Sequence, residues 1–432
     1  MGSMIYLAVG RLEIDWGKNN SFTDHSPLFQ IHDIDNVPYH YVGEELEHGE
    51  HGNEEKHRWE IITEFKKGLK KPLAEVVDRI RLLGYTSAWS EKEFIYLSNL
   101  NGFETNRFTF NQLREALGNV DVNSLLLEYG DGNEDFGEFF LKQIYPCLGF
   151  PELPPELMSE LRRFGDGMEN LSAYTVIQLL AENPTARNLP VIWAFNDVEE
   201  GGWAMRSEFV RPLDPSNRFL IVTEGSSDAA IIRHAFQLLK PHIADFFNYV
   251  DMAEGYPFSG TGNLYRFVQG LISIGIMNNI IVIFDNDAEG VASFNRCCKL
   301  NIPNNMRILR LPDHPQFYDF ETIGPNGKSR ANINGQGAAI ECYLDLRDEY
   351  LMRWNNFNSE SGNYQGELIG KDRYKKKFLD QRKRIEDYNY SKIEGVLEMI
   401  INNCEGMQQE ARMKELELLT DIPQVEICIG DF

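Results

Sequence analysis

Paired cysteines, long apolar runs and an excess of positive charge are all missing from this sequence of 432 residues. None of the six cysteines forms a Cys-x-x-Cys pair, which argues against a zinc ribbon or a disulfide framework and favours a reducing compartment. No apolar run approaches the roughly 18–20 residues of a membrane span, and the amino end lacks the features of a secretory signal peptide. We therefore expect a cytoplasmic protein with no membrane partner.

Positive charge is scarce: 42 Lys and Arg residues stand against 66 Asp and Glu residues, a formal net charge of -24. This balance argues against non-specific coating of nucleic acid, because such binding depends on basic residues that neutralise phosphates. It does not exclude an enzyme that brings divalent cations and a local basic strip to a nucleic acid. The charge would equally serve solubility or a basic protein partner.

The sequence pattern predicts three parts. Residues 4–210 are expected to form an α+β amino-terminal domain, with strands where apolar residues alternate and a helix from Leu69 to Leu83. Clustered turn residues around Arg211–Pro215 mark the boundary to a second domain over residues 216–345. Residues 346–432 are expected to form a helical carboxy-terminal extension that carries a basic strip.

The second domain has the most regular pattern. Strand-like and helix-like segments alternate, and the strands are expected at 219–223, 246–250, 280–284 and 306–311. This alternation predicts a Rossmann-like α/β fold, a parallel sheet flanked by helices through right-handed crossovers. Ligands of such sheets bind at the carboxyl ends of the strands.

Acidic residues follow two of the predicted strands at that edge. Glu224 comes after the first strand, with Asp228 at the start of the next helix, and Asp285 and Asp287 come after the third. Hard cations such as Mg²⁺ prefer carboxylate ligands together with water and substrate phosphate. Each motif alone also has an ordinary explanation, since Asp228 could cap the helix and Asp285 and Asp287 could belong to a turn. Together they predict a site for one or two Mg²⁺ or Mn²⁺ ions.

These residues resemble a known catalytic domain. Glu224-Gly225-x-x-Asp228, Ser259-Gly260-Thr261-Gly262 and Asp285-x-Asp287, in this order, are similar to the motifs of the Toprim domain. Topoisomerases, bacterial primases, OLD-family nucleases and some RNases share this domain. The Glu-x-x-x-Asp spacing resembles the OLD-type nucleases more than the topoisomerases.

The same resemblance implies two further site residues. Glu341 is similar to a later metal-binding acid of the OLD-type nucleases, although Ala339 stands where that family often has Ser. Lys371 is similar to a lysine that would stabilise charge on the phosphate. Both residues also fit an ordinary solvent-exposed position.

The amino-terminal part carries a second resemblance. Residues 12–19, with the sequence LEIDWGKN, are similar to the start of the HEPN/Toprim-associated amino-terminal domain. That domain precedes HEPN or Toprim effector domains in bacterial proteins, often linked to conflict with phage. A buried Trp16 followed by a turn explains the same residues equally well. The resemblance implies a domain that serves as a sensor or partner platform.

Lys371–Arg384 forms a basic strip in this acidic chain, with Tyr374 and Phe378 available for packing or for stacking on bases. A solvated helix face explains the strip as well. We therefore expect a metal-dependent nuclease acting on DNA or RNA as an anti-phage effector, with Glu224, Asp285, Asp287 and Lys371 as catalytic residues. The alternatives are a topoisomerase- or primase-like nucleotidyl transferase and a non-catalytic subunit that binds nucleic acid or a protein. A regulatory protein partner and a homo-oligomer remain open.

Overall fold

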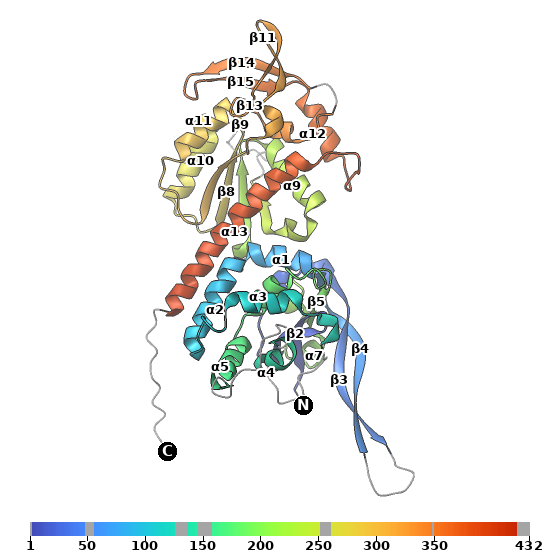
Figure 1. Cartoon of the computed structure of the whole chain (residues 1–432). Coiled ribbons are helices and arrows are strands. Elements are labelled where there is room, and N and C mark those ends of the chain that lie inside the picture. The colour runs from blue at the N-terminus through green and yellow to red at the C-terminus, as the bar shows by residue number, and fades with distance from the viewer. Residues whose placement is uncertain are drawn as a thin grey trace. The chain divides into compact units, whose positions relative to one another are not determined.

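The computed structural model describes residues 2–47, 56–125, 136–145, 158–250, 261–347 and 350–420. The chain divides into two compact units, Met1–Pro212 with Gln409–Phe432, and Leu213–Gln408 (Figure 1). The division falls in the turn-rich segment that separates the first two predicted parts. Residues 346–408, expected in a separate extension, belong to the second unit.

An antiparallel sheet forms the centre of the first unit, in the strand order β2-β1-β5-β4-β3. Its strands are β1 (Met4–Val9), β2 (Leu12–Lys18), β3 (Ile34–Glu47), β4 (Lys56–Pro72) and β5 (Pro190–Ala194). The apolar alternation at the amino end predicts β1 and β2, and the inward-facing Ile5, Leu7 and Val9 are buried. Together with the helices of this unit, the sheet confirms the predicted α+β character.

Helices cover the rest of the first unit. They are α1 (Leu73–Leu82), α2 (Ser87–Asn101), α3 (Phe110–Asn119), α4 (Phe136–Phe139), α5 (Met158–Glu169), α6 (Ala173–Leu180), α7 (Asn196–Glu200) and α8 (Arg206–Phe209). The helix predicted from Leu69 begins four residues later, because Leu69 pairs with Ile34 and Trp193 in the sheet. Pro72 then fixes the helix start.

None of the helices in the described ranges combines the length and the apolar character that crossing a bilayer requires. The four cysteines within those ranges, Cys297, Cys298, Cys342 and Cys404, are free thiols.

Glu93 of α2 is a buried carboxyl in the core of the first unit. It accepts hydrogen bonds from the Thr175 hydroxyl, at 2.6 Å, and from the Ser172 backbone N–H, at 3.3 Å. Burial raises the pKa of Glu93 to about 7, and these two hydrogen bonds offset the effect only in part. Glu93 therefore favours the folded state below pH 4.5, and this contribution is lost as the pH rises to about 7.

We expect Glu93→Gln to stabilise the protein above pH 7, by on the order of 2–3 kcal/mol, and to change its stability little near pH 4.5. Urea unfolding of both proteins at pH 5, 6, 7 and 8 measures this. The difference between them should grow with pH. A difference that is constant across this range would contradict a raised pKa at Glu93.

A four-stranded parallel sheet forms the centre of the second unit, in the order β10-β8-β6-β7. Its strands are β6 (Phe219–Thr223), β7 (Phe247–Tyr249), β8 (Asn279–Phe284) and β10 (Met306–Arg310). The helices that alternate with them are α9 (Ser226–Leu239), α10 (Thr261–Ser273) and α11 (Ala288–Cys297). This confirms the predicted α/β fold with a parallel sheet and helices.

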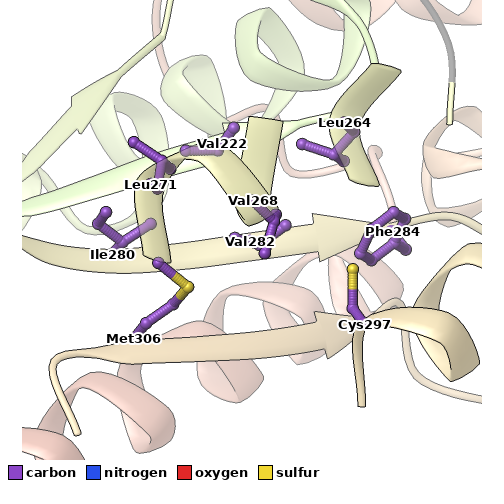
Figure 2. Packing of buried hydrophobic residues seen from close by; sticks show 9 residues of the cluster. All are labelled: Val222, Leu264, Val268, Leu271, Ile280, Val282, Phe284, Cys297 and Met306. Carbon is purple, nitrogen blue, oxygen red and sulfur yellow. The ribbon is translucent and has the colours of Figure 1, made fainter. Parts of the chain in front are cut away.

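One face of this sheet packs against α10 and α11 through apolar side chains (Figure 2). Ile280, Val282 and Phe284 alternate along β8 and point into this layer, where they meet Leu264 and Val268 of α10. All five side chains are almost completely buried. The layer holds β8 firmly against its neighbours and so fixes the positions of the residues at its carboxyl end.

Two further sheets, one helix and the first part of another helix complete the second unit, which ends at Gln408. The sheets consist of β12-β11-β14-β15 and of β13-β9. The strands are β9 (Asn286–Asp287), β11 (Phe320–Gly324), β12 (Gly327–Ala331), β13 (Gly337–Ala338), β14 (Met352–Asn358) and β15 (Asn363–Leu368), and the helices are α12 (Lys371–Leu379) and α13 (Ser391–Thr420). The region predicted as a helical extension therefore begins with a β-hairpin. β14 pairs with β11, which lies about 30 residues earlier, so local helical spacing does not reveal it.

Candidate functional site

The acidic residues that follow β6 and β8 leave the sheet at the same edge. The two strands are neighbours and parallel, with Val222 opposite Val282 and Thr223 opposite Ile283. Glu224 and Asp285 therefore emerge side by side, and the Asp285 backbone N–H donates a 3.1 Å hydrogen bond to Glu224 Oε1. The rule that parallel strands present ligand-binding residues at their carboxyl ends predicts this arrangement.

Three other carboxyl groups are held near this pair. The Asp228 side chain folds back over the start of α9 and accepts a 3.0 Å hydrogen bond from the Gly225 N–H. Asp287 caps α11 by accepting from the Gly290 N–H at 2.7 Å. Glu341 is buried and accepts a 2.9 Å hydrogen bond from the Ser227 hydroxyl. The structure thus places the five predicted metal-binding residues near one another: Glu224, Asp228, Asp285, Asp287 and Glu341.

Pairing between β9 and β13 holds the segment of Glu341 next to the segment of Asp285 and Asp287. Asp287 and Asn286 of β9 pair with Gly337 and Ala338 of β13, which leads directly into the segment of Glu341. Asp285 Oδ1 also accepts a 3.1 Å hydrogen bond from the Ile340 N–H. We call these five residues the carboxylate cluster.

The carboxylate cluster is electrostatically unfavourable when fully ionised. Burial raises the pKa of Asp228 to about 7, and the negative charge of Glu341 adds to this effect. Burial also raises the pKa of Asp285 well above its usual range, and the charges of Asp228 and Glu224 raise it further. Burial raises the pKa of Glu224 well above its usual value, and the charge of Asp287 adds to this effect. Carboxylates that repel one another in a partly buried site gain stability from a bound cation.

The donor chemistry of the cluster fits a hard divalent cation. It offers only carboxylate oxygens, the ligands that Mg²⁺ and Mn²⁺ prefer. Across the described residues, no three His, Cys, Asp or Glu side chains already converge as a metal-binding group. Each carboxylate instead accepts a hydrogen bond from a backbone or side-chain donor. Metal binding would require these side chains to rotate toward a common centre.

Lys371 begins α12 and is half exposed. Its Nζ forms an ion pair with Glu367 Oε1 at 3.1 Å. Its charge nevertheless acts on the carboxylate cluster. Burial raises the pKa of Asp287, and the charge of Lys371, together with stronger hydrogen bonds, opposes this rise. Lys371 therefore lies beside the cluster but is held by another carboxylate.

The basic strip Lys371–Arg384 is only partly helical, because α12 ends at Leu379. Tyr374 and Phe378 are almost fully buried, so they pack into the second unit and are not available for stacking on bases. The lysines and arginines of the strip are exposed, except for the half-buried Lys375. The strip is therefore a basic surface segment, helical as far as Leu379, whose own aromatic side chains are buried.

Sequence reasoning missed two residues that hydrogen-bond to the cluster and one whose charge acts on it. Gln365 of β15 donates from Nε2 to Asp287 Oδ2 at 2.5 Å, and its Oε1 accepts from the Glu289 N–H at 3.0 Å. Ser227 holds Glu341, and Lys375 opposes the rise in the pKa of Asp228. Ser227 could have been suspected from its place between Glu224 and Asp228. Gln365 carries no such signal, because only tertiary pairing brings β15 to the site.

Ser259 and Gly260 of the predicted Gly-rich motif lie outside the described residues.

Gly290 sits in the first turn of α11, where the chain approaches the cluster most closely. A Cβ atom there would lie 2.3 Å from the Asp285 carbonyl oxygen and 3.0 Å from Glu224 Oε1. We expect Gly290→Ala to destabilise the protein by about 1–3 kcal/mol and to displace Glu224. Gly270→Ala in α10 is the matched control, because nothing lies within 4 Å of its Cβ. It should stabilise the protein by about 0.5–1 kcal/mol.

Thermal unfolding of the two variants provides the test. Equal stability of Gly290→Ala and Gly270→Ala would contradict the close approach of α11 to the Asp285 backbone.

Comparison with known proteins adds one finding about the first unit. A family model described as HEPN/Toprim N-terminal domain 1 matches residues 1–217. No curated protein and no solved structure matches the chain. The match includes residues 12–19 and confirms the resemblance found there, and it ends just before β6. It covers half of the 432 residues.

Proposed function

Because the chain belongs to the HEPN/Toprim N-terminal domain 1 family, we propose that its second unit is a Toprim-type nuclease that depends on Mg²⁺ or Mn²⁺. The observation that carries this proposal is the carboxylate cluster at the carboxyl edge of a parallel sheet. Five acids from three chain segments lie near one another there, in a partly buried position where burial raises the pKa of Glu224, Asp228, Asp285 and Asp287. A purely structural site would gain nothing from this repulsion.

Electrostatic repulsion links the members of the cluster. Apart from burial, Glu224 is affected most by Asp287, and Asp228 is affected most by Glu341. Asp285 interacts with all four of these carboxylates. In our proposal Glu224, Asp228, Asp285, Asp287 and Glu341 would hold one or two metal ions. Such ions would lower the pKa of the attacking water and stabilise the charge that develops on the phosphate.

The surrounding residues of the chain would position the reaction. Gln365 and the Gly290 N–H hold Asp287, and Ser227 holds Glu341, so the ligands are supported by defined partners. Lys371 would leave Glu367 for the scissile phosphate and balance its negative charge. The exposed basic residues of α12 would contact neighbouring phosphates of a DNA or RNA strand. The resemblance of the amino-terminal unit to domains found in bacterial conflict with phage supports a role as a defence effector.

Incubation of the purified chain with plasmid, single-stranded DNA and total tRNA tests the proposal. Each substrate is combined with Mg²⁺, Mn²⁺ or EDTA. We expect at least one substrate to be cut with a metal and none to be cut with EDTA. Glu224→Gln should be inactive, whereas Glu386→Gln, at an exposed acid outside the cluster, should retain activity. Absence of cutting in every condition, or cutting that persists in EDTA, would contradict the proposal.

A further inference from the structure

A pocket of the second unit has a buried lysine among its lining residues. Its volume is about 440 Å³, and its lining includes Lys392, Arg330, Arg347, Gln316 and Asn389. None of its lining residues belongs to the carboxylate cluster. The volume lies within the range of pockets that hold small organic ligands.

Lys392, in the first turn of α13, is only 7% exposed. Within the described part of the chain, its ammonium group makes no hydrogen bond and no ion pair, and it lies over the Phe317 ring, 5.6 Å from the centroid. Lys71, the comparably buried lysine of the first unit, instead contacts Asp33, Glu75 and Gln30. A buried ammonium without a counter-ion is unfavourable, and the ring contact offsets only part of that cost. In agreement, burial lowers the pKa of Lys392.

The acids that line this pocket are already engaged. Asp345 is buried and accepts from Arg347 Nε at 2.6 Å, from the Arg347 N–H and from the Asn389 N–H. Asp319 accepts from Arg330 Nε at 2.8 Å. Each arginine thus has a carboxylate partner, and Arg330 also pairs with Glu321 Oε1 at 3.6 Å. The charge of Asp345 acts on Lys392 as well, but no carboxylate of the described residues lies within ion-pair distance of its ammonium group. Lys392 is therefore the cation of the lining that is available to pair with an anionic ligand.

We propose that this pocket binds a nucleotide through its phosphate group, with Lys392 as the phosphate-binding residue. A phosphate would pair with the Lys392 ammonium group, and the half-exposed guanidinium groups of Arg330 and Arg347 lie at the same pocket to contact its oxygens. The amides of Gln316 and Asn389 offer donors and acceptors to the rest of the ligand. The nucleotide is either free in solution or the terminal nucleotide of a strand.

Isothermal titration calorimetry of the full chain in EDTA measures this binding without a contribution from metal or cleavage. The ligands are AMP, adenosine, and one oligonucleotide with either a 5′-phosphate or a 5′-hydroxyl. We expect AMP to bind at least about tenfold more tightly than adenosine, and Lys392→Met to remove this preference. Lys383→Met, which removes an exposed charge outside the pocket, should bind AMP like the wild type. Preference for the phosphorylated oligonucleotide over AMP would identify a strand end as the ligand.

Two results would overturn the inference: equal affinity for AMP and adenosine, or AMP affinity of Lys392→Met within twofold of the wild type. Lys392→Met should fold, since it removes an unpaired buried charge, and its melting temperature checks this. A second measurement uses the wild type alone. AMP should protect Lys392, but not Lys383, from trinitrobenzenesulfonate, as detected by mass spectrometry. Lack of protection at Lys392 would also overturn the inference. The variant Asp285→Asn/Asp287→Asn should bind AMP normally, so this test and that of the proposed nuclease are separable.

Discussion

Asp285→Asn/Asp287→Asn should reduce metal-dependent cleavage by at least about a thousandfold, the scale expected when metal ligands of a phosphodiesterase are lost. The two residues leave β8 together, and Asp285 interacts with all other members of the cluster. Asparagine preserves the shape of both side chains, so the Ile340 N–H and the Gly290 N–H keep an oxygen acceptor, and only the Gln365 amide loses one, at Asp287 Oδ2. The loss should therefore reflect the missing charges and not a disrupted fold. Initial rates on the preferred substrate, with saturating Mn²⁺, measure the effect.

This double variant also separates the nuclease from a binding subunit. Its nucleic-acid affinity, measured by fluorescence anisotropy in EDTA, should stay close to that of the wild type, because the exposed basic residues of α12 are unchanged. If the variant still protected cells against phage while its metal binding was lost, the non-catalytic alternative would be correct. Glu386→Gln again provides the control for a single surface charge.

Mg²⁺ or Mn²⁺ should raise the melting temperature of the wild-type protein by about 5–10 °C at a metal concentration near a hundred times the dissociation constant. The physical reason is the repulsion within the carboxylate cluster, which raises the pKa of Glu224, Asp228 and Asp285 when no cation is present. A bound cation removes this penalty in the folded state only. EDTA should reverse the increase completely.

The double variant gives the opposite pattern and so serves as the control. Without metal, Asp285→Asn/Asp287→Asn should melt at a higher temperature than the wild type, because two mutually repelling charges are gone. Adding Mg²⁺ should leave its melting temperature nearly unchanged. An equal increase in both proteins would place the stabilising ion elsewhere in the chain.

The sequence was sufficient for the parts of the fold that depend on local pattern. The apolar runs at 219–223 and 280–284 and the helical spacing between them identified β6, α9 and β8 within two residues. Helical crossovers between the strands then predicted that the strands are parallel. Parallel strands place Glu224 and Asp285 at the same edge of the sheet. These inferences work because burial on both faces makes such strands continuously apolar.

The remaining features depend on pairing between distant segments. Gln365 reaches Asp287 only because β15 lies beside β13, and the Gly366 N–H donates to the Gln336 carbonyl oxygen at 2.8 Å. Leu69 has the spacing of a helix but is used by the sheet, where Trp193 lies beside it. Nothing in the sequence around Lys392 indicates that this lysine is buried without an ion-pair partner among the described residues. Each case is a tertiary contact that overrides, or is invisible to, local propensity.

The pairing of β9 with β13 has a consequence for how the protein is made. Ser227 and Glu341 are 114 positions apart, and Gln365 reaches Asp287 across 78 positions. A growing chain on the ribosome carries Glu224 and Asp228 long before the segment that supplies Glu341. The carboxylate cluster therefore cannot be completed in a nascent chain until residue 341, and its support by Gln365 comes later still. High contact order in this way delays assembly of the proposed active site until most of the second unit has been synthesised.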